Sequence, residues 1–229
     1  MTKISIILPV LNEASAIAQT LIALQPLREA GHEVIVVDGG SHDNTITLSK
    51  PYADKIIQKS RGRSRQMNDG AKSASHEILL FLHGDTFLPA RADRLIIEGM
   101  KSMGSRWGRF DVKLSGKHPL LRIIEILMNW RSRLSRIATG DQAIFVKREL
   151  FEAIGGFPEI NLMEDVALCK ILKKYDRPLC LYQPVLTSSR RWEEKGLLRT
   201  ILLMWFLRLA YFFKVNPKRL AKFYYPTLE

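Results

Sequence analysis

An apolar run that stops abruptly in an acidic, glycine-rich turn is the feature that most constrains this chain. Residues 33–37 are Glu-Val-Ile-Val-Val, and Asp38-Gly39-Gly40 follow at once. Short runs rich in β-branched residues are typical of strands that are buried on both faces of a sheet. Asp38 is therefore expected at the carboxyl end of a buried strand, where open α/β sheets bind their ligands.

Two more apolar runs end in polar loops in the same way. Residues 4–8 lead into a loop that contains Glu13, and residues 78–82 lead into a loop that contains Asp85. Because segments of helical period separate these runs, we expect a largely parallel sheet with crossover helices. Three acidic strand ends, Asp38 among them, would then meet at one edge of that sheet.

The length and composition favour one elaborated domain rather than two. The chain has 229 residues and is 46% hydrophobic, which is enough for a substantial core. Helices are expected at 64–75 and 92–103, and Asn12 is expected to cap the helix that follows the first strand. Residues 107–115 alternate like an antiparallel strand and residues 142–147 predict another, so the second half is expected to be a mixed extension.

The formal net charge of +12 favours an anionic partner. Nucleic acid, anionic lipid and a phosphorylated small molecule are the three candidates. The basic clusters are scattered and lack interleaved aromatic residues, which argues against nucleic acid. Cys169 and Cys180 are too few and too isolated for a disulfide framework or a structural zinc site. No apolar leader follows Met1, so we expect a cytoplasmic protein.

Two later segments have the pattern of helices that meet a surface. Polar residues of 120–136 share one side of a helix, so its apolar side is expected to face the core, although Trp130 among arginines would also suit lipid. Residues 197–213 are apolar nearly all round, but their longest uncharged stretch is far shorter than the ~20 residues that cross a bilayer. Two interpretations of this helix are equally favoured. It packs in a core or dimer interface, or it lies on the inner face of the membrane with the basic tail 214–222 against anionic headgroups.

Four short motifs lie along the chain at the ends of the expected strands and helices. They are Ile-Ile-Leu-Pro-Val-Leu-Asn-Glu at 6–13, Val-Val-Asp-Gly-Gly-Ser-His-Asp-Asn-Thr at 36–45, Leu-His-Gly-Asp-Thr at 82–86 and Met-Glu-Asp-Val at 163–166. In this order they resemble the motifs of family-2 glycosyltransferases, and within that family the small bacterial branch of selenodomain-associated transferases. The resemblance implies a GT-A-like, Rossmann-type mixed α/β sheet with crossover helices at 1–192. Residues 193–229 would form an apolar and basic helical tail on the domain, a dimer interface or a membrane surface.

The resemblance implies that a nucleotide-diphosphate sugar is the donor. Asp38 corresponds to the family's carboxylate that reads the base, and a basic residue at the position of Arg63 faces the nucleotide in the family. The implied contacts with the donor nucleotide are Pro9, Leu11, Glu13, Asp38, Arg63 and Asp85.

A divalent cation, Mn²⁺ or Mg²⁺, is implied as cofactor. Asp85 corresponds to the metal-binding carboxylate of the family's Asp-x-Asp motif, but His83 stands where the first Asp is expected. Both cations prefer oxygen ligands and share them with substrate phosphates, whereas an imidazole ligand would favour Mn²⁺. His83 could therefore contact the metal, the ribose or neither, and a plain structural role at the strand end is the alternative.

The same resemblance implies an inverting reaction. Asp165 would be the base that deprotonates the acceptor hydroxyl, with Glu164 as its companion, whereas the alternative is a first-turn carboxylate that complements the helix dipole. Arg191 would stabilise the leaving diphosphate, in a reduced form of the family's Gln-x-x-Arg-Trp motif. The implied contacts with the donor or acceptor sugar are Asp141, Gln142, Arg191 and Trp192.

Together these features predict a metal-dependent transferase that moves a single sugar to a hydroxyl acceptor. A lipid-linked acceptor, peripheral contact with an anionic membrane and a homo-oligomer are secondary hypotheses. A nucleotidyltransferase is one alternative, although a glycine- and lysine-rich triphosphate loop near the first strand is missing. A non-catalytic module that binds anionic membrane or nucleic acid is the other.

Overall fold

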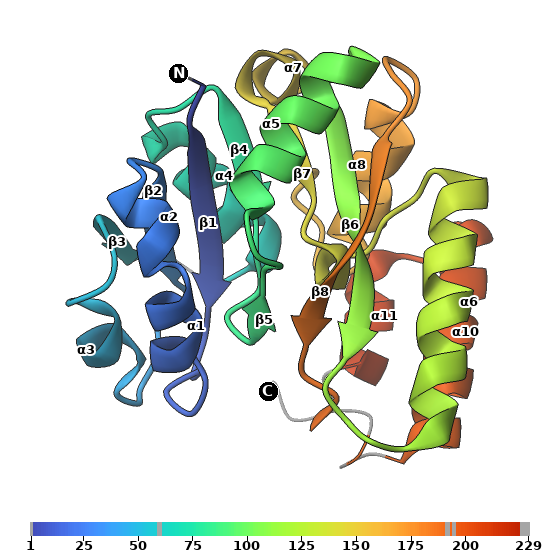
Figure 1. The fold of residues 1–229 in the computed structure, drawn as a ribbon. Helices are drawn as coiled ribbons and strands as arrows, with labels where there is room; N and C mark the ends of the chain where they lie inside the picture. Colours follow the sequence, from blue (N-terminus) through green and yellow to red (C-terminus); the bar gives the residue numbers. More distant parts are fainter. Residues whose placement is uncertain (1, 59–60, 191–192, 194–195, 225–229) are drawn as a thin grey trace.

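The computed structural model describes residues 2–58, 61–190, 193 and 196–224, and these fold around one mixed β-sheet. The strands are β1 (Ile4–Val10), β2 (Glu33–Asp38), β3 (Lys55–Gln58), β4 (Ile78–Phe81), β5 (Thr86–Phe87), β6 (Trp107–Leu114), β7 (Phe145–Lys147) and β8 (Leu179–Thr187). Their order across the sheet is β3-β2-β1-β4-β7-β6-β8-β5 (Figure 1). Strands β1 to β4 are parallel, whereas β7 runs antiparallel to both of its neighbours. The predicted α/β fold with a mixed sheet is confirmed.

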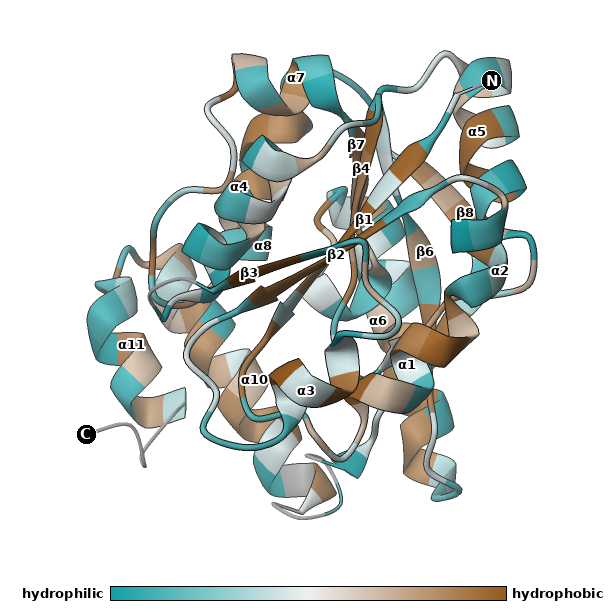
Figure 2. Cartoon of the chain, turned by 90° about the vertical axis from the view of Figure 1, so that its left-hand side faces the viewer, coloured by the Kyte–Doolittle hydropathy of each residue, from teal (hydrophilic) through white to brown (hydrophobic). Residues whose placement is uncertain are grey.

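Helices cover both faces of this sheet. They are α1 (Ile17–Ala23), α2 (Gln25–Glu29), α3 (Thr45–Ser49), α4 (Arg63–Ser73), α5 (Ala92–Met103), α6 (Pro119–Ser135), α7 (Arg148–Ala153), α8 (Glu164–Leu172), α10 (Leu197–Phe212) and α11 (Pro217–Tyr224), with a 3-10 turn η1 at Gly140–Gln142. Ile6 and Leu8 of β1 pack with α1 and α5, whereas Ile7 packs with α4, α7 and α8 on the opposite face. This alternation follows from the two-residue period of a strand. Strands β1 to β4 accordingly lie at the centre, largely in hydrophobic colours (Figure 2).

Two predicted local features are wrong. The strand expected at 142–147 begins only at Phe145, because η1 occupies the preceding residues and Ala143 adopts a left-handed conformation with φ 46°. Asn12 does not cap a helix, since α1 begins at Ile17. Asn12 instead adopts φ 53° and accepts a hydrogen bond from the His42 N–H at 2.9 Å. Its side chain therefore joins the loops that follow β1 and β2.

Helix α6 turns its polar side toward the sheet, opposite to the expected orientation. Asn129 exchanges hydrogen bonds with the backbone of Val112 at 2.9 and 3.0 Å, and Arg133 donates to Asp111 at 2.7 Å. Strand β6 carries buried charged groups that need such partners, which explains the reversal. The exposed large apolar residues of α6 are Leu120, Ile123, Ile126, Leu127, Trp130 and Leu134.

Helix α10 packs along one side only. Its Leu207 is buried against Met163 and Val166 beside α8 and against Leu220 of α11, and Ile201 contacts α6. The opposite side exposes Leu202, Trp205, Phe206, Leu209 and Phe212, and Phe213 just after the helix is exposed as well. Among the described residues no helix is long and apolar enough to cross a membrane.

A buried carboxylate fastens the amino end of the sheet. Glu33 of β2 lies 2.7 Å from the Lys55 ammonium, and its side chain is 9% exposed. It also accepts hydrogen bonds from the hydroxyl of Ser5 at 2.7 Å and the N–H of Ser75 at 2.8 Å. Burial by itself would raise the pKa of Glu33, but these donors lower that pKa from 4.5 to about 2.

Replacing Glu33 by glutamine is expected to lower the free energy of unfolding at pH 7 by about 2–3 kcal/mol, because the depressed pKa corresponds to that order of stabilisation. A lowered pKa stabilises the fold above pH 4.5, and the effect is lost as the pH falls toward about 2. Urea unfolding from pH 7 to pH 3 measures the difference, which should shrink at acid pH. Glu29→Gln is the exposed control. Equal stability of Glu33→Gln and wild type at pH 7 would contradict the assignment.

Candidate active site

The ends of β1 and β2 are fixed side by side at the carboxyl edge of the sheet. Val10 pairs in register with Asp38. Gln66 of α4 is buried, and its side-chain amide donates to the carbonyl oxygens of Val10 at 2.9 Å and Val37 at 2.7 Å. Sequence reasoning missed this clamp, because nothing in the pattern separated Gln66 from the other polar residues of its helix.

Asp38 anchors the turn after β2. Its carboxylate is buried and accepts hydrogen bonds from the N–H groups of Gly40 and Ser41, each at 3.0 Å. The Ser41 hydroxyl donates a third. Gly40 has φ 94°, a conformation that favours glycine. Asp38 thus gives the loop at the edge of the sheet a fixed shape.

The loops after β1 and β2 are joined by further hydrogen bonds. The N–H of Glu13 donates to the Thr45 hydroxyl at 2.8 Å, and the N–H of Ala14 donates to the Asp43 carboxylate at 3.1 Å. Asp43 also accepts from the N–H of Thr45 at 3.0 Å, so it orders the loop rather than facing a ligand. The two loops form one preorganised wall.

Glu13 places a second carboxylate close to Asp85. Burial, and then the negative charge of Asp85, raise the pKa of Glu13. One carboxylate oxygen of Glu13 is buried without a hydrogen-bond partner and lies 3.9 Å from the Arg190 guanidinium. Acidic groups from the ends of β1 and β4 therefore meet, as the sequence predicted.

His83 faces η1 rather than solvent. Its Nδ1 lies 3.3 Å from the Asp141 carboxylate, and the ring packs so closely on Gly140 that a Cβ there would clash with it. Burial opposes ionisation of Asp141, but the hydrogen bond and charge of His83 hold the pKa of Asp141 below its ordinary value. The end of β4 and η1 are thereby linked by a pair that sequence reasoning did not foresee.

The first turn of α8 presents the carboxylates of Glu164 and Asp165. Met163, just before the helix, has φ 67°, which is uncommon for a residue other than glycine. Asp165 accepts a hydrogen bond from the N–H of Gly140 at 2.8 Å. Glu164 is buried, and burial together with the charge of Asp165 raises its pKa. The two carboxylates therefore have different environments, which suits different chemical roles.

Asn68 of α4 fixes the turn that leads toward α8. Its side chain accepts from the N–H of Phe157 at 2.8 Å and donates to the carbonyl of the same residue at 2.9 Å. Gly156 has φ 76°, and a Cβ there would press against the Asn68 side chain. Helix α4 thus supports both the strand ends and the approach to the acidic pair.

A small pocket at this edge is lined by several of the predicted site residues. They include Pro9, Arg63, His83, Glu164 and Asp165. The positive charge of Arg63 partly offsets the rise in the pKa of Glu13 and of Glu164 and helps to lower the pKa of Asp141, so this guanidinium lies among the acidic groups.

Other predicted site residues lie elsewhere. Gln142 is fully buried and bonds to Thr139 and Asn129, behind the edge rather than at it. Leu11 is half-buried just after β1. Arg191 and Trp192 lie outside the described residues.

The residues at the site fit a cation that is shared with a substrate. Among the described residues, no group of three or more His, Cys, Asp or Glu side chains could hold a metal ion by itself. Mg²⁺ and similar ions are commonly held by one or two carboxylates together with substrate phosphates. Asp85, with Glu13 beside it, provides that donor set, whereas the Nδ1 of His83 is already directed to Asp141.

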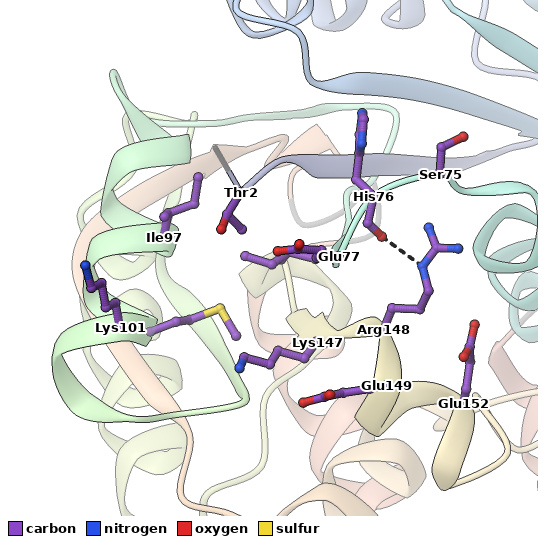
Figure 3. Close-up of a pocket in the computed structure, with 12 residues that line it drawn as sticks. Thr2, Ser75, His76, Glu77, Ile97, Lys101, Lys147, Arg148, Glu149 and Glu152 are labelled. Atoms are coloured by element: carbon purple, nitrogen blue, oxygen red, sulfur yellow. Dashed lines mark hydrogen bonds between the residues drawn. The ribbon is translucent and has the colours of Figure 1, made fainter.

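A cavity of about 740 Å³ lies at the opposite, amino edge of the sheet (Figure 3). Both acidic and basic side chains line it, including Glu77, Lys101, Lys147 and Glu149. Arg148 is tied to the backbone carbonyl of His76 at 2.8 Å. None of the predicted site residues lines this cavity.

Solved structures share this fold. The structure of *Staphylococcus aureus* TarS 1-349 in complex with UDP-GlcNAc has a TM-score of 0.67 and 19% identity, over 82% of this chain and 58% of that one. The mannosyltransferase PcManGT from Pyrobaculum calidifontis, in complex with GDP-Man and Mn²⁺, has a TM-score of 0.61 and 24% identity, over 81% and 56%. These likenesses confirm a GT-A-like fold.

Sequence comparison identifies the family. Residues 5–155 match the family described as Glycosyl transferase family 2. A poly-beta-1,6-N-acetyl-D-glucosamine synthase of Staphylococcus epidermidis is 31% identical over 217 residues, 84% of this chain and 52% of that protein. The corresponding synthase of *Staphylococcus aureus* is 33% identical over 104 residues, 43% and 25%. This chain thus spans a quarter to about half of the length of these relatives. Placement in the selenodomain-associated branch stays a prediction, but the chain belongs to glycosyltransferase family 2.

Proposed function

We propose that this protein transfers a single sugar from a nucleotide-diphosphate sugar to a hydroxyl acceptor, with inversion. The observation that carries the proposal is the pocket at the carboxyl edge, where Asp165 and Glu164 line the same space as Pro9, Arg63 and His83. A donor held by the strand ends would thus present its anomeric carbon to the acidic pair. Family membership and the nucleotide sugars bound by TarS and PcManGT support it.

The donor nucleotide would lie along the joined loops after β1 and β2. Pro9, Leu11 and Glu13 would border the base and ribose. The carboxylate of Asp38, held in place by the loop after β2, would contact the base. Arg63 would face the phosphates as a fixed cation, which matches its position among acidic groups that need neutralising.

A divalent cation would be held by Asp85 and the donor diphosphate, with Mn²⁺ or Mg²⁺ both compatible with oxygen ligands. When bound, such an ion neutralises the diphosphate as it leaves. His83 would hold Asp141 toward the donor sugar through the 3.3 Å contact, and Gln142 would support η1 from behind. Arg191 and Trp192 remain proposed contacts with the leaving group and the sugar.

Asp165 would accept the proton of the acceptor hydroxyl as that oxygen attacks the anomeric carbon. The hydrogen bond from the Gly140 N–H fixes the carboxylate at 2.8 Å, which leaves its orientation defined before the acceptor arrives. Glu164 has a raised pKa, so it suits a hydrogen bond to the acceptor rather than a negative charge beside Asp165.

A thermal-shift panel tests the function directly. UDP, GDP, CDP, dTDP and their sugar conjugates are added with Mn²⁺, Mg²⁺ or EDTA, and a ligand of the native state raises the melting temperature. We expect one nucleotide to give a metal-dependent rise, followed by release of that nucleoside diphosphate on turnover. The absence of any shift would favour a non-catalytic binding role. The corresponding nucleoside triphosphates are run in parallel, and a shift with triphosphates alone would favour a nucleotidyltransferase.

The apolar sides of α6 and α10 support a second proposal, that the protein works at an anionic membrane surface. Trp130 and Leu134 of α6 and Trp205 and Phe212 of α10 are all at least 65% exposed. The basic residues near the end of the chain are Lys214, Lys218, Arg219 and Lys222. Aromatic and apolar side chains beside lysines and arginines suit the headgroup region. The acceptor would then be linked to lipid, and the protein would lie on the inner face of the membrane.

Replacing Trp205 by glutamate is expected to weaken binding to vesicles of phosphatidylcholine and phosphatidylglycerol at least ten-fold, because a charge replaces an inserted ring. Co-sedimentation measures bound protein. Met103→Glu is the matched control, since Met103 is 67% exposed on α5 and Trp205 is 69% exposed on α10. Equal vesicle binding of both variants would contradict the membrane proposal. A change from dimer to monomer by light scattering would instead assign the face to a homodimer.

A further inference from the structure

Two arginines from neighbouring helices lie together beside the proposed base. Arg131 belongs to α6 and Arg208 to α10, and these helices run side by side (Figure 1), with Ile124 and Ile201 in the hydrophobic cluster between them. Both guanidinium groups lie close enough to Asp165 to interact with its charge. The pair thus lies within electrostatic range of the proposed base, and neither arginine has a role in the reaction described above.

Both arginines are partly buried, and each has side-chain nitrogens that lack a hydrogen-bond partner. The Nε and one terminal nitrogen of Arg131 and the Nε of Arg208 are buried without a hydrogen-bond partner. Within the described part of the chain, no carboxylate forms a salt bridge with either one. Unbonded donors on a partly buried cation are unfavourable, and a bound anion would satisfy them.

The nearby carboxylates are directed elsewhere. Asp165 accepts from the N–H groups of Gly140 at 2.8 Å and Val166 at 2.7 Å, and Asp141 contacts His83 at 3.3 Å. Each arginine also repels the other: burial, and then the charge of Arg208, lower the pKa of Arg131 to about 10. An anion between the two would relieve both effects.

The surroundings of the pair are apolar on the solvent side. Trp130 precedes Arg131 and is 65% exposed, and Leu209 follows Arg208 and is 59% exposed. The two exposed sides continue along α6 and α10, where Ile126 and Trp205 are also open to solvent. A ligand that matches both the paired cations and this surface has an anionic head and an apolar tail.

We propose that Arg131 and Arg208 bind the phosphate group of an amphiphilic acceptor beside Asp165, with the apolar tail along the exposed sides of α6 and α10. Guanidinium groups match phosphate oxygens through paired hydrogen bonds, which favours phosphate over other anions. The inference rests on the proposed function, because it names the acceptor class of that same site. The donor diphosphate is assigned to the other side of the pocket, toward Arg63 and Asp85.

The test compares three probes: inorganic phosphate, decyl phosphate kept below its critical micelle concentration, and decanol. Calorimetry on the full chain should give a Kd for decyl phosphate at least ten-fold lower than for inorganic phosphate, and no comparable binding of decanol. The double variant Arg131→Met with Arg208→Met should weaken decyl phosphate binding at least ten-fold. Arg199→Met, an exposed position on α10, should stay within two-fold of wild type.

A melting measurement and two lysine variants show whether weaker binding comes from the loss of the arginines or from misfolding. Without ligand, the double methionine variant should melt no lower than wild type, because two partly buried charges with unbonded nitrogens are removed. Should it not fold, Arg131→Lys and Arg208→Lys keep the charge but lose the planar fork, and each should weaken decyl phosphate binding several-fold.

Several outcomes would overturn the inference. If the double variant Arg131→Met with Arg208→Met binds decyl phosphate as tightly as wild type, the two arginines do not form the phosphate site. Equal affinity for decyl and inorganic phosphate points to a soluble phosphate ester and rejects the amphiphile. Loss of the nucleotide-dependent melting shift in the double variant would assign the pair to the donor diphosphate. If no nucleotide raises the melting temperature of wild type, the proposed function fails. The comparison of decyl phosphate with inorganic phosphate still tests whether Arg131 and Arg208 bind an amphiphilic phosphate.

Discussion

Replacing Asp165 by asparagine is expected to lower the rate of sugar transfer about 10²–10⁴-fold, the usual contribution of a general base. The amide oxygen of asparagine can still accept the hydrogen bond from the Gly140 N–H, so the start of α8 should keep its geometry. Donor binding should therefore change little. The measurement is the release of nucleoside diphosphate under single-turnover conditions, together with the melting shift given by the donor.

Glu159→Gln serves as the matched control for Asp165→Asn. Glu159 is 59% exposed, and its ion pair with Arg65 at 3.1 Å is of a kind worth little. The Glu159→Gln variant should therefore transfer sugar at the wild-type rate. Turnover of Asp165→Asn within ten-fold of wild type would leave Asp165 as a helix-start carboxylate without a catalytic role. Loss of the donor-induced melting shift would mean that the variant damages the donor site.

Replacing Asp85 by asparagine is expected to abolish the Mn²⁺-dependent part of nucleotide binding and to lower transfer about 10²–10⁴-fold, because neutralising the leaving diphosphate is worth several kcal/mol. The change also takes a negative charge away from Glu13, so the pKa of Glu13 should fall toward its ordinary value. Melting curves with nucleoside diphosphate, with and without Mn²⁺, report the loss directly.

Asp69→Asn is the control for Asp85→Asn. Asp69 lies on α4, and its carboxylate pairs with the exposed Lys72 at 3.8 Å. Both variants should fold, and only Asp85→Asn should lose the metal effect. If Asp85→Asn keeps a metal-dependent shift, the cation is held by other groups, and His83→Ala would then be tested for the same loss.

The motifs at the strand ends could be predicted because they combine local pattern with sheet geometry. Asp38, Glu13 and Asp85 each follow an apolar run, and parallel strands bring such ends to one edge. The same reasoning could not find the clamp of Gln66 or the contact between His83 and Asp141. Both depend on which residue of one element faces which residue of another, and that information is not local.

Helix α6 illustrates the limit most clearly. Its amphipathic period was correct, but the period alone does not say which side faces the core. The polar side faces inward because Asp111 of β6 is buried and Arg133 pairs with it. A strand that carries a buried carboxylate needs a polar helix beside it, and that preference reversed the expected orientation. Short strands such as β5 were likewise missed, since a two-residue strand exists only through its pairing with β8.

The sequence by itself determined the family, the parallel half of the sheet and the set of acidic strand ends. These follow from composition, two-residue alternation and short motifs, which act over a few neighbouring residues. Only the tertiary structure decided the direction of α6, the half-exposed state of α10 and the packing of these helices that brings the charges of Arg131 and Arg208 within range of Asp165. Those features depend on buried polar groups finding partners across the fold, because an unpaired buried charge costs more than an exposed apolar side chain.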